Sequence, residues 1–324
     1  MAILPASSEI ASRKRLFQNW ENQASVRSAP IRVLRASEGS LPFAPELLPI
    51  VNDSRVKERG PGVGYFILAL KLLNYLSWTA LLEAEAVMPI CKAIGFRNIP
   101  WPLHPETALE GLKIHTDEAH HTFFSEYTRH QAIILTGVRP GKDRSPLFMA
   151  ELARSQAGRN RRARLLTLLM FVCVSETLIS KSLMKIPADL RVIKGVRLMV
   201  DDHARDESRH RLFFSDILVS VWQRLSPRER DHYGPMLATW IEVFLSPDYA
   251  NEAGWLEAAG FAPGESHAIV RETYEAIDYS AVCREAAGPM LLLLKKHGIT
   301  DNSATYDAFA KRRLIPESYS PPTP

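Results

Sequence analysis

The sequence is poor in cysteine and has no cysteine pair at metal-binding spacing. Only three of its 324 residues are cysteines, and Cys91, Cys173 and Cys283 lie far apart. Neither a disulfide framework nor a zinc finger is therefore indicated, and this cysteine usage is typical of a protein of the reducing cytoplasm. The formal net charge of +4 is too small to indicate a nucleic-acid-binding protein.

The sequence also lacks an apolar run long enough to indicate a membrane span. Its greasiest stretch, LLTLLMFVCVSETLIS, has about ten apolar residues before Ser175 and Glu176 interrupt it. A spanning helix needs about twenty. The N-terminal residues do not show the apolar run of a signal peptide. We therefore expect a soluble cytoplasmic protein that has neither a membrane nor a nucleic acid as its partner.

No stretch alternates apolar and polar residues with the period of a β-strand, whereas four long segments have helical spacing. These segments lie at residues 65–88, 105–135, 162–185 and 193–225, and further helices are expected at 233–245 and 266–277. Expected helix breakers are Pro89, Gly95, Pro100, the glycines at 137–141 and Pro187. We predict an all-α protein in which residues 61–315 form the main domain. Residues 1–60 are an extension that packs on it, and 316–324 are an extended tail.

Two of the long segments carry a Glu-x-x-His pair. Glu118 and His121 form the first pair, and Glu207 and His210 form the second. Residues three apart on a helix lie about 60° from each other, so each pair can share a metal ion. His203, seven residues before His210, falls on the same helix face.

Lone carboxylates occur in the other two long segments. Glu83 and Glu176 each stand among apolar neighbours, where an unpaired charge would be costly. In chain order the segments offer Glu, Glu-x-x-His, Glu and Glu-x-x-His, which is the ligand set of di-iron and di-manganese carboxylate bundles. The sequence therefore predicts a ferritin-like four-helix bundle core with additional helices.

Charge balance supports two divalent ions in this core. Four converging carboxylates would repel one another, and two such ions would neutralise them. Oxygen and imidazole ligands without thiolate favour iron, with manganese as the weaker alternative. Asp117 and Asp206 each stand four residues before a ligand histidine, so they are candidates to accept the proton on its other nitrogen. The alternative for both is ordinary surface charge.

Several neighbouring residues are set aside by helical geometry. His120 points about 100° away from His121, and Glu85 about 200° away from Glu83. His115, at the edge of the metal face, is expected to be a packed histidine, and Cys173 a core cysteine. Residues 154–164 hold five arginines. We interpret this run as the solvated start of a helix, and the alternative is a docking face for an acidic partner.

The stretches LLEAEAVMP, TDEAHHTFF, VSETLIS and HARDESRH resemble the ferritin-like di-iron N-oxygenases, the family of p-aminobenzoate N-oxygenase and chloramphenicol arylamine oxygenase. The resemblance selects Glu83, six residues before Pro89, and implies that His203 is an additional ligand. It implies that Glu83, Glu118 and His121 hold one iron and that the other is held by Glu176, His203, Glu207 and His210. Glu118 and Glu207 are candidates to bridge the irons, and with His203 they are the expected catalytic residues.

The resemblance further implies that dioxygen and a primary amine (aryl, alkyl or amino acid) react to a hydroxylamine, nitroso or nitro product in secondary-metabolite biosynthesis. No flavin or nicotinamide site is recognisable, so an external electron donor is implied. The amine could be free or held on an acidic carrier protein, and a homodimer is expected. The alternatives are a di-iron hydroxylase or desaturase acting on carbon, a non-enzymatic iron-binding bundle, and a metal-free helical interaction protein.

Overall fold

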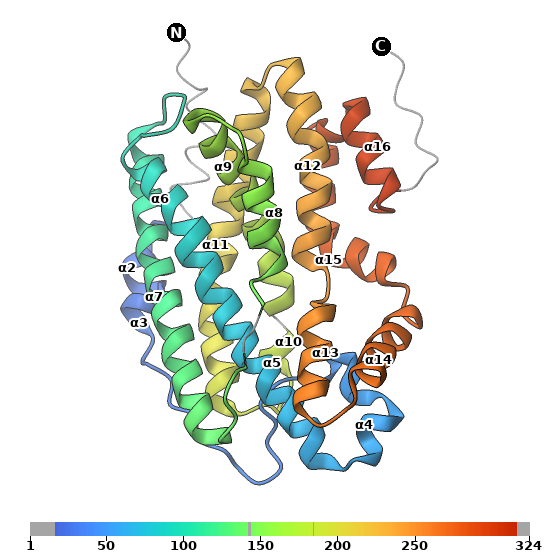
Figure 1. Ribbon diagram of the computed structural model, residues 1–324. Coiled ribbons are helices and arrows are strands. Elements are labelled where there is room, and N and C mark those ends of the chain that lie inside the picture. The colour runs from blue at the N-terminus through green and yellow to red at the C-terminus, as the bar shows by residue number, and fades with distance from the viewer. Residues whose placement is uncertain (1–16, 142–143, 184, 316–324) are drawn as a thin grey trace. The chain divides into compact units, whose positions relative to one another are not determined.

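The computed structural model describes residues 17–141, 144–183 and 185–315. Within these residues the regular secondary structure is helical, apart from an isolated bridge between Leu41 and Val192 (Figure 1). The all-α, ferritin-like class predicted from the sequence is confirmed. The predicted tail, 316–324, and the first 16 residues of the predicted extension lie outside the described residues.

The chain divides into two compact units, each built from three separate stretches. The first unit takes in Met1–Arg144, Leu183–Arg209 and Asp248–Ile277, and the second takes in Ser145–Ser182, His210–Pro247 and Asp278–Pro324, less the residues outside the description. The longest helices therefore do not all belong to one unit. In particular, the helix Lys194–Arg224 begins in the first unit and ends in the second.

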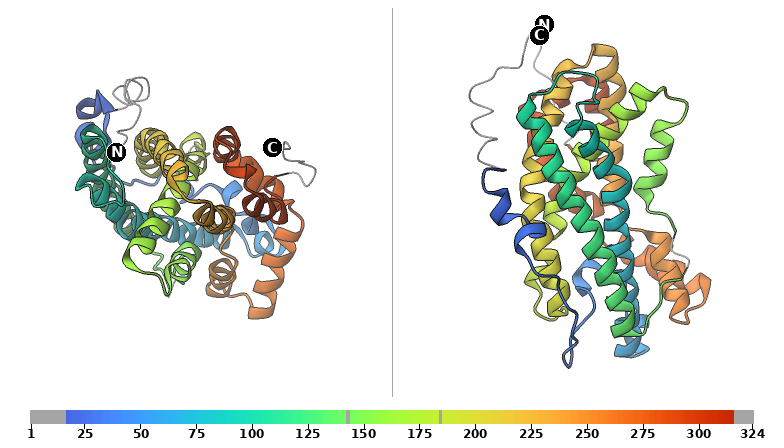
Figure 2. Two further views of the ribbon diagram at one scale, coloured as in Figure 1. Left: turned by 90° about the horizontal axis from the view of Figure 1, so that it is seen from above. Right: turned by 90° about the vertical axis from the view of Figure 1, so that its left-hand side faces the viewer.

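The first unit is organised around α5 and α7, which pack side by side. Its elements are α2 (Trp20–Gln23), α3 (Ser25–Ser28), η1 (Pro45–Leu47), η2 (Pro49–Asn52), α4 (Ser54–Glu58), α5 (Pro61–Leu82), η3 (Glu83–Val87), α6 (Met88–Gly95), α7 (Pro105–Thr136), α10 (Lys185–Ala188), the first part of α11 (Lys194–Arg224), α13 (Tyr249–Ala258) and α14 (Pro263–Glu275). Both views in Figure 2 show the short helices α2 and α3 beside α7.

The second unit is organised around α12, which contacts α8, α15 and α16. Its elements are α8 (Leu147–Gln156), α9 (Arg161–Leu183, except its last residue), the second part of α11, α12 (Pro227–Leu245), α15 (Tyr279–Lys296), η4 (Ile299–Asp301) and α16 (Ser303–Lys311). A capping box between Ser226 and Glu229 fixes the start of α12. Trp240 packs on Phe171 and donates its indole N–H to Ser155 Oγ at 3.2 Å.

Local sequence explains where the site-bearing helix α7 begins and ends. Pro105 occupies its first turn, where a missing N–H costs no helical hydrogen bond, and His104 accepts from the Glu106 amide. Gly137 ends the helix with φ at 69°, a left-handed conformation that glycine adopts without steric cost. Between these ends, buried and exposed residues recur with helical spacing over about nine turns of α7. The helical pattern of residues 105–135 predicted this helix.

The run Pro61–Gly95 is long and apolar enough to cross a membrane by length and composition. However, 61% of its most apolar window is buried inside the protein, and α5 and α6 both pack against α7. This burial is typical of a core helix, so we interpret the run as part of the bundle.

Pro89 was expected to break the helix, and this prediction was wrong. The chain passes from α5 through the π-helical turn η3 into α6 without interruption, and Pro89 lies in the first turn of α6. Helices α8, α13, α15 and α16 were not predicted as separate elements. Each is nine to eighteen residues long. Asp248, Asp278 and Asn302 cap the starts of α13, α15 and α16, whereas Pro146 precedes α8 without a side-chain cap.

Candidate metal centre

Glu83 is the first residue of the π-helical turn. The amide of Met88 bonds to the carbonyl of Glu83, five residues before it, because Pro89 cannot donate to the carbonyl of Glu85. The wider turn leaves Glu83 fully buried while Glu85, two residues later, is exposed. The orientation expected for these two carboxylates is therefore observed.

Glu118 and His121 lie on the buried face of α7, one turn apart. His121 Nδ1 is 2.9 Å from Glu118 Oε2 and 3.4 Å from Glu207 Oε1 on α11, and all three side chains are fully buried. His203, also on α11, places Nε2 at 3.1 Å from Glu207 Oε1 and 3.5 Å from Glu83 Oε1. The rings of His121 and His203 lie 4.3 Å apart, centroid to centroid.

Four of these residues form a group that can hold a metal ion. One ligand atom from each of Glu83, His121, His203 and Glu207 lies within 4.8 Å of the others, and every member is buried. The group combines residues that the family resemblance assigns to different irons. Glu207, a predicted bridging ligand, is the member that contacts both imidazoles.

The other two predicted ligands lie in the second unit. His210 Nδ1 is 3.9 Å from a carboxylate oxygen of Glu176, and both side chains are fully buried. On α11, His210 follows Glu207 by three residues, so the two share a helix face. That Glu176 and His210 join the five residues of the first unit in one di-iron centre stays a prediction.

The surroundings of His121 and His203 shift the pKa values of these two imidazoles in opposite directions. Burial alone would lower the pKa of His121, but the carboxylates of Glu118, Asp206 and Glu207 raise that pKa well above its usual range. Burial, helped by the neighbouring His121, lowers the pKa of His203. A raised pKa favours the protonated imidazole, so protons would compete with a metal ion for His121 Nδ1.

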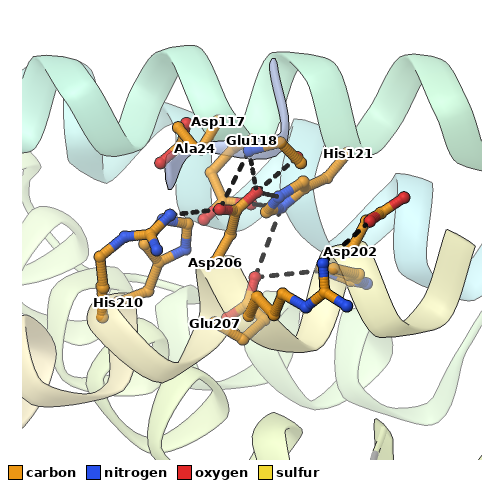
Figure 3. Close-up of polar contacts among 12 residues, drawn as sticks. Ala24, Asp117, Glu118, His121, Asp202, Asp206, Glu207 and His210 are labelled. Carbon is orange, nitrogen blue, oxygen red and sulfur yellow. Dashed lines mark hydrogen bonds and ion pairs between the residues drawn. The ribbon is translucent and has the colours of Figure 1, made fainter. Parts of the chain in front are cut away.

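Asp117 and Asp206 are fully buried, which excludes the alternative that both are ordinary surface charges. Asp206, on α11, accepts a hydrogen bond from His121 Nε2 on α7 at 3.1 Å, so its histidine partner lies on the facing helix (Figure 3). Nδ1 of the same ring is thereby left to face the ligand carboxylates. Asp117 accepts from the indole of Trp20, a partner that was not predicted.

The neighbours that were set aside are placed as follows. His115 Nδ1 lies 3.2 Å from the carbonyl of Met88, so His115 is a packed histidine, as expected. Cys173 is buried, and burial together with the charge of Glu176 raises the pKa of its thiol well above the usual value. His120 is half-buried and its ring packs edge-on against Phe124.

A small pocket of about 10 Å³ lies beside the group of four potential ligands, Glu83, His121, His203 and Glu207. It is bounded by the N-terminal segment, α7 and α11, and its lining residues are Ala29, Pro30, Ile31, Arg32, His120, Phe124, Tyr127, Thr128, Met199 and Asp202. Phe124 separates the pocket from the ligands, because its ring lies 5.2 Å from the His121 ring and 5.6 Å from the His203 ring. Phe124 was missed in the sequence, where a buried phenylalanine on an apolar face carries no functional signal.

Two comparisons with known proteins bear on this site. The search of curated proteins gives no match. The family model described as "P-aminobenzoate N-oxygenase AurF" matches residues 7–298, nearly the whole chain, and so includes all seven predicted ligands. The chain therefore belongs to the p-aminobenzoate N-oxygenase AurF family, whose members are di-iron oxygenases.

Proposed function

We propose that this protein is a di-iron amine N-oxygenase that uses dioxygen and external electrons to oxidise a primary amine to a hydroxylamine and on to nitroso or nitro products. The observation that carries the proposal is the buried group of Glu83, His121, His203 and Glu207 in a chain of this family. His203 supplies the additional imidazole that distinguishes this ligand set from the four-Glu, two-His set of other carboxylate bundles.

The donor atoms fit iron. Carboxylate and imidazole donors suit ferrous and ferric ions, and the described residues of the group include no thiolate. The three carboxylates of Glu83, Glu118 and Glu207 are fully buried in one unit, where positive charge stabilises them. Glu83, Glu118, His121, Glu176, His203, Glu207 and His210 are the residues that would hold two irons, which when reduced supply electrons to dioxygen.

The protein residues orient this chemistry and keep water away. Asp206 accepts the Nε2 proton of His121, which fixes the tautomer that presents Nδ1 as a ligand atom. Phe124 closes the side of the group that faces the pocket, and Leu72, Leu73 and Leu76 of the adjoining helix are fully buried. A dry site limits the loss of reactive species to water.

The test is ferrous loading without oxygen, followed by oxygen exposure with a panel of aryl amines, alkyl amines and amino acids. We expect about two irons per chain and products whose masses and fragment ions place the added oxygen on nitrogen. The Glu207→Ala variant serves as the inactive control. Iron occupancy near zero or one per chain would contradict the di-iron centre. Iron uptake without amine oxidation would indicate an iron-binding bundle, and oxygen on carbon would indicate a hydroxylase.

We further propose that electrons come from a separate reductase or a small-molecule reductant. The arginine run does not by itself mark the docking site. Arg159 is half-buried, with its guanidinium 5.9 Å from the centre of the Tyr233 ring, and Arg154 pairs with Glu151 in α8. Arg161 and Arg164 are exposed at the start of α9, as a solvated helix start requires. An acidic carrier or redox partner at these two arginines is the alternative proposal.

A further inference from the structure

The N-terminal segment from Phe17 to Leu34 follows α7 at a constant register. Lys113 Nζ donates to the Phe17 carbonyl at 3.1 Å, and the Leu34 amide donates to Gln131 Oε1 at 3.0 Å. These contacts join residues 96 and 97 positions apart in the sequence. The segment is therefore attached near both of its ends, and the part between them is held against the helix that carries Glu118 and His121.

Between these attachments the segment contacts Asp117 and Asp206, the two aspartates that precede the predicted ligands Glu118 and Glu207. Trp20 Nε1 donates to the two carboxylate oxygens of Asp117 at 3.0 and 2.9 Å. The backbone amide of Ser25 donates to the two oxygens of Asp206 at 3.2 and 3.1 Å, and the Ser25 hydroxyl donates to Asp206 as well. Trp20 and Ser25 are themselves buried, so water does not compete for these hydrogen bonds.

Asp206 connects the segment to a predicted metal ligand. Besides Ser25, it accepts from Arg209 on its own helix and from His121 Nε2 on α7. Figure 3 shows its carboxylate between the backbone near Ala24 and the imidazole of His121. Asp206 and Asp117 also directly precede Glu207 and Glu118 in the sequence.

We propose that Trp20 and Ser25 are positioning residues of the metal centre, which fix the carboxylate planes of Asp117 and Asp206 and through Asp206 the ring of His121. The proposal rests on the di-iron function proposed above. The side-chain torsion of an aspartate carboxylate is broad unless donors define it. A forked N–H donor at Asp117 and two donors from one serine at Asp206 provide that definition, and outer-shell orientation of this kind tunes metal affinity.

The test compares ferrous binding by Trp20→Phe and Ser25→Ala with the wild type. Trp20→Phe keeps an aromatic ring in the buried site and removes the indole N–H. Ser25→Ala removes the hydroxyl and keeps the backbone amide. We expect ferrous affinity to fall roughly threefold to tenfold in each variant, with altered near-infrared magnetic circular dichroism of the ferrous sites. Ser25→Thr, which keeps the hydroxyl, should restore much of the affinity and the spectrum.

Trp240→Phe is the matched control, because it also removes a buried hydrogen bond from an indole N–H, in this case to Ser155 Oγ. We expect it to lower the melting temperature without changing ferrous affinity or the spectrum. Unchanged affinity and spectrum in both Trp20→Phe and Ser25→Ala would overturn the inference and leave the segment a packing element. If the wild type binds no iron, the proposed function fails instead. Should Trp20→Phe not fold, as judged by circular dichroism, Ser25→Ala decides the outcome alone.

Discussion

At the scale of single residues, His203 has the position that best separates the possible chemistries. Its Nε2 lies 3.1 Å from Glu207 and 3.5 Å from Glu83, on two different helical elements. A neutral imidazole here changes the ligand field without adding charge. We therefore expect His203→Ala to keep most of its iron but to lose amine oxidation at least about tenfold, as measured by metal analysis and product mass spectra. Full wild-type N-oxidation in this variant would remove His203 from the ligand set.

Glu207 illustrates the conflict between stability and function in a buried carboxylate cluster. Its carboxylate contacts the imidazoles of His121 and His203, and it is fully buried, as are the carboxylates of Glu83 and Glu118. In the metal-free protein, Glu207→Gln removes one of these buried negative charges, so we expect an equal or higher melting temperature. The rise in melting temperature that ferrous ions give the wild type should be lost, together with activity. A variant that unfolds at neutral pH would instead indicate that Glu207 has a structural role.

Residue spacing predicted the ligand candidates, but it could not predict their partners. Glu118 and His121 are three residues apart on one helix, and this periodicity is visible in the sequence. The contacts of Trp20 with Asp117 and of Ser25 with Asp206 span 97 and 181 residues. Contacts between residues so far apart in the sequence depend on how the chain folds back. In addition, no sequence pattern around a tryptophan or a serine indicates a role beside a metal.

At the scale of elements, Pro89 is the residue that explains the π-helical turn at Glu83. We expect Pro89→Ala to supply the missing amide and to let the turn close into α-helix, which rotates Glu83 away from His203. Helix content should be retained, whereas ferrous affinity should fall roughly tenfold or more. Circular dichroism and ferrous titration check both parts. Pro105→Ala, at the start of α7, is the control, and an equal loss in both variants would contradict this role of the π-turn.

Long helices could be predicted and short ones could not, for a physical reason. The segments that became α5, α7, α9 and α11 show many repeats of the helical apolar period, so local pattern and tertiary burial agree. Helices such as α8 and α13 have ten residues each, too few for the pattern to stand out. They are stabilised by their neighbours, as Asn251 shows, because its side chain accepts from the amide of Arg144, 107 residues away.

At the scale of the whole molecule, the two units interleave along the chain, and no composition change marks their limits. The first unit closes on itself through α13 and α14, which follow α12 of the second unit in sequence. Within the first unit, Lys71 of α5 lies 5.8 Å from the centre of the Trp255 ring of α13. Such returns of the chain are not visible in a sequence, and the expected domain at 61–315 stays a prediction. The expected homodimer stays a prediction for light scattering.

Glu252 of α13, which lies near Lys71 of α5 and Tyr274 of α14, should make folding stability depend on pH. Burial raises the pKa of Glu252 to about 7, although Lys71 and a hydrogen bond of 3.0 Å from the Tyr274 hydroxyl act to lower it. Its ordinary pKa is 4.5. Between these two values the native protein holds a proton that the unfolded chain has released. The free energy of unfolding therefore falls as pH rises through this window, by about 3 kcal/mol at most.

Glu252→Gln isolates this contribution, because glutamine still accepts the Tyr274 hydrogen bond but cannot ionise. At pH 8 the variant should be more stable than the wild type by about 1 to 3 kcal/mol, since the wild type must bury a charged carboxylate there. At pH 4.5 the difference should be small, because Glu252 of the unfolded chain is then half protonated, and well below pH 4.5 it should vanish, because Glu252 is protonated in both the folded and the unfolded chain. Urea unfolding of the metal-free protein at the two pH values measures it, and Glu257→Gln, at an exposed position of α13, is the matched control. A difference between wild type and Glu252→Gln that does not change with pH would show that Glu252 keeps its ordinary pKa in the folded protein.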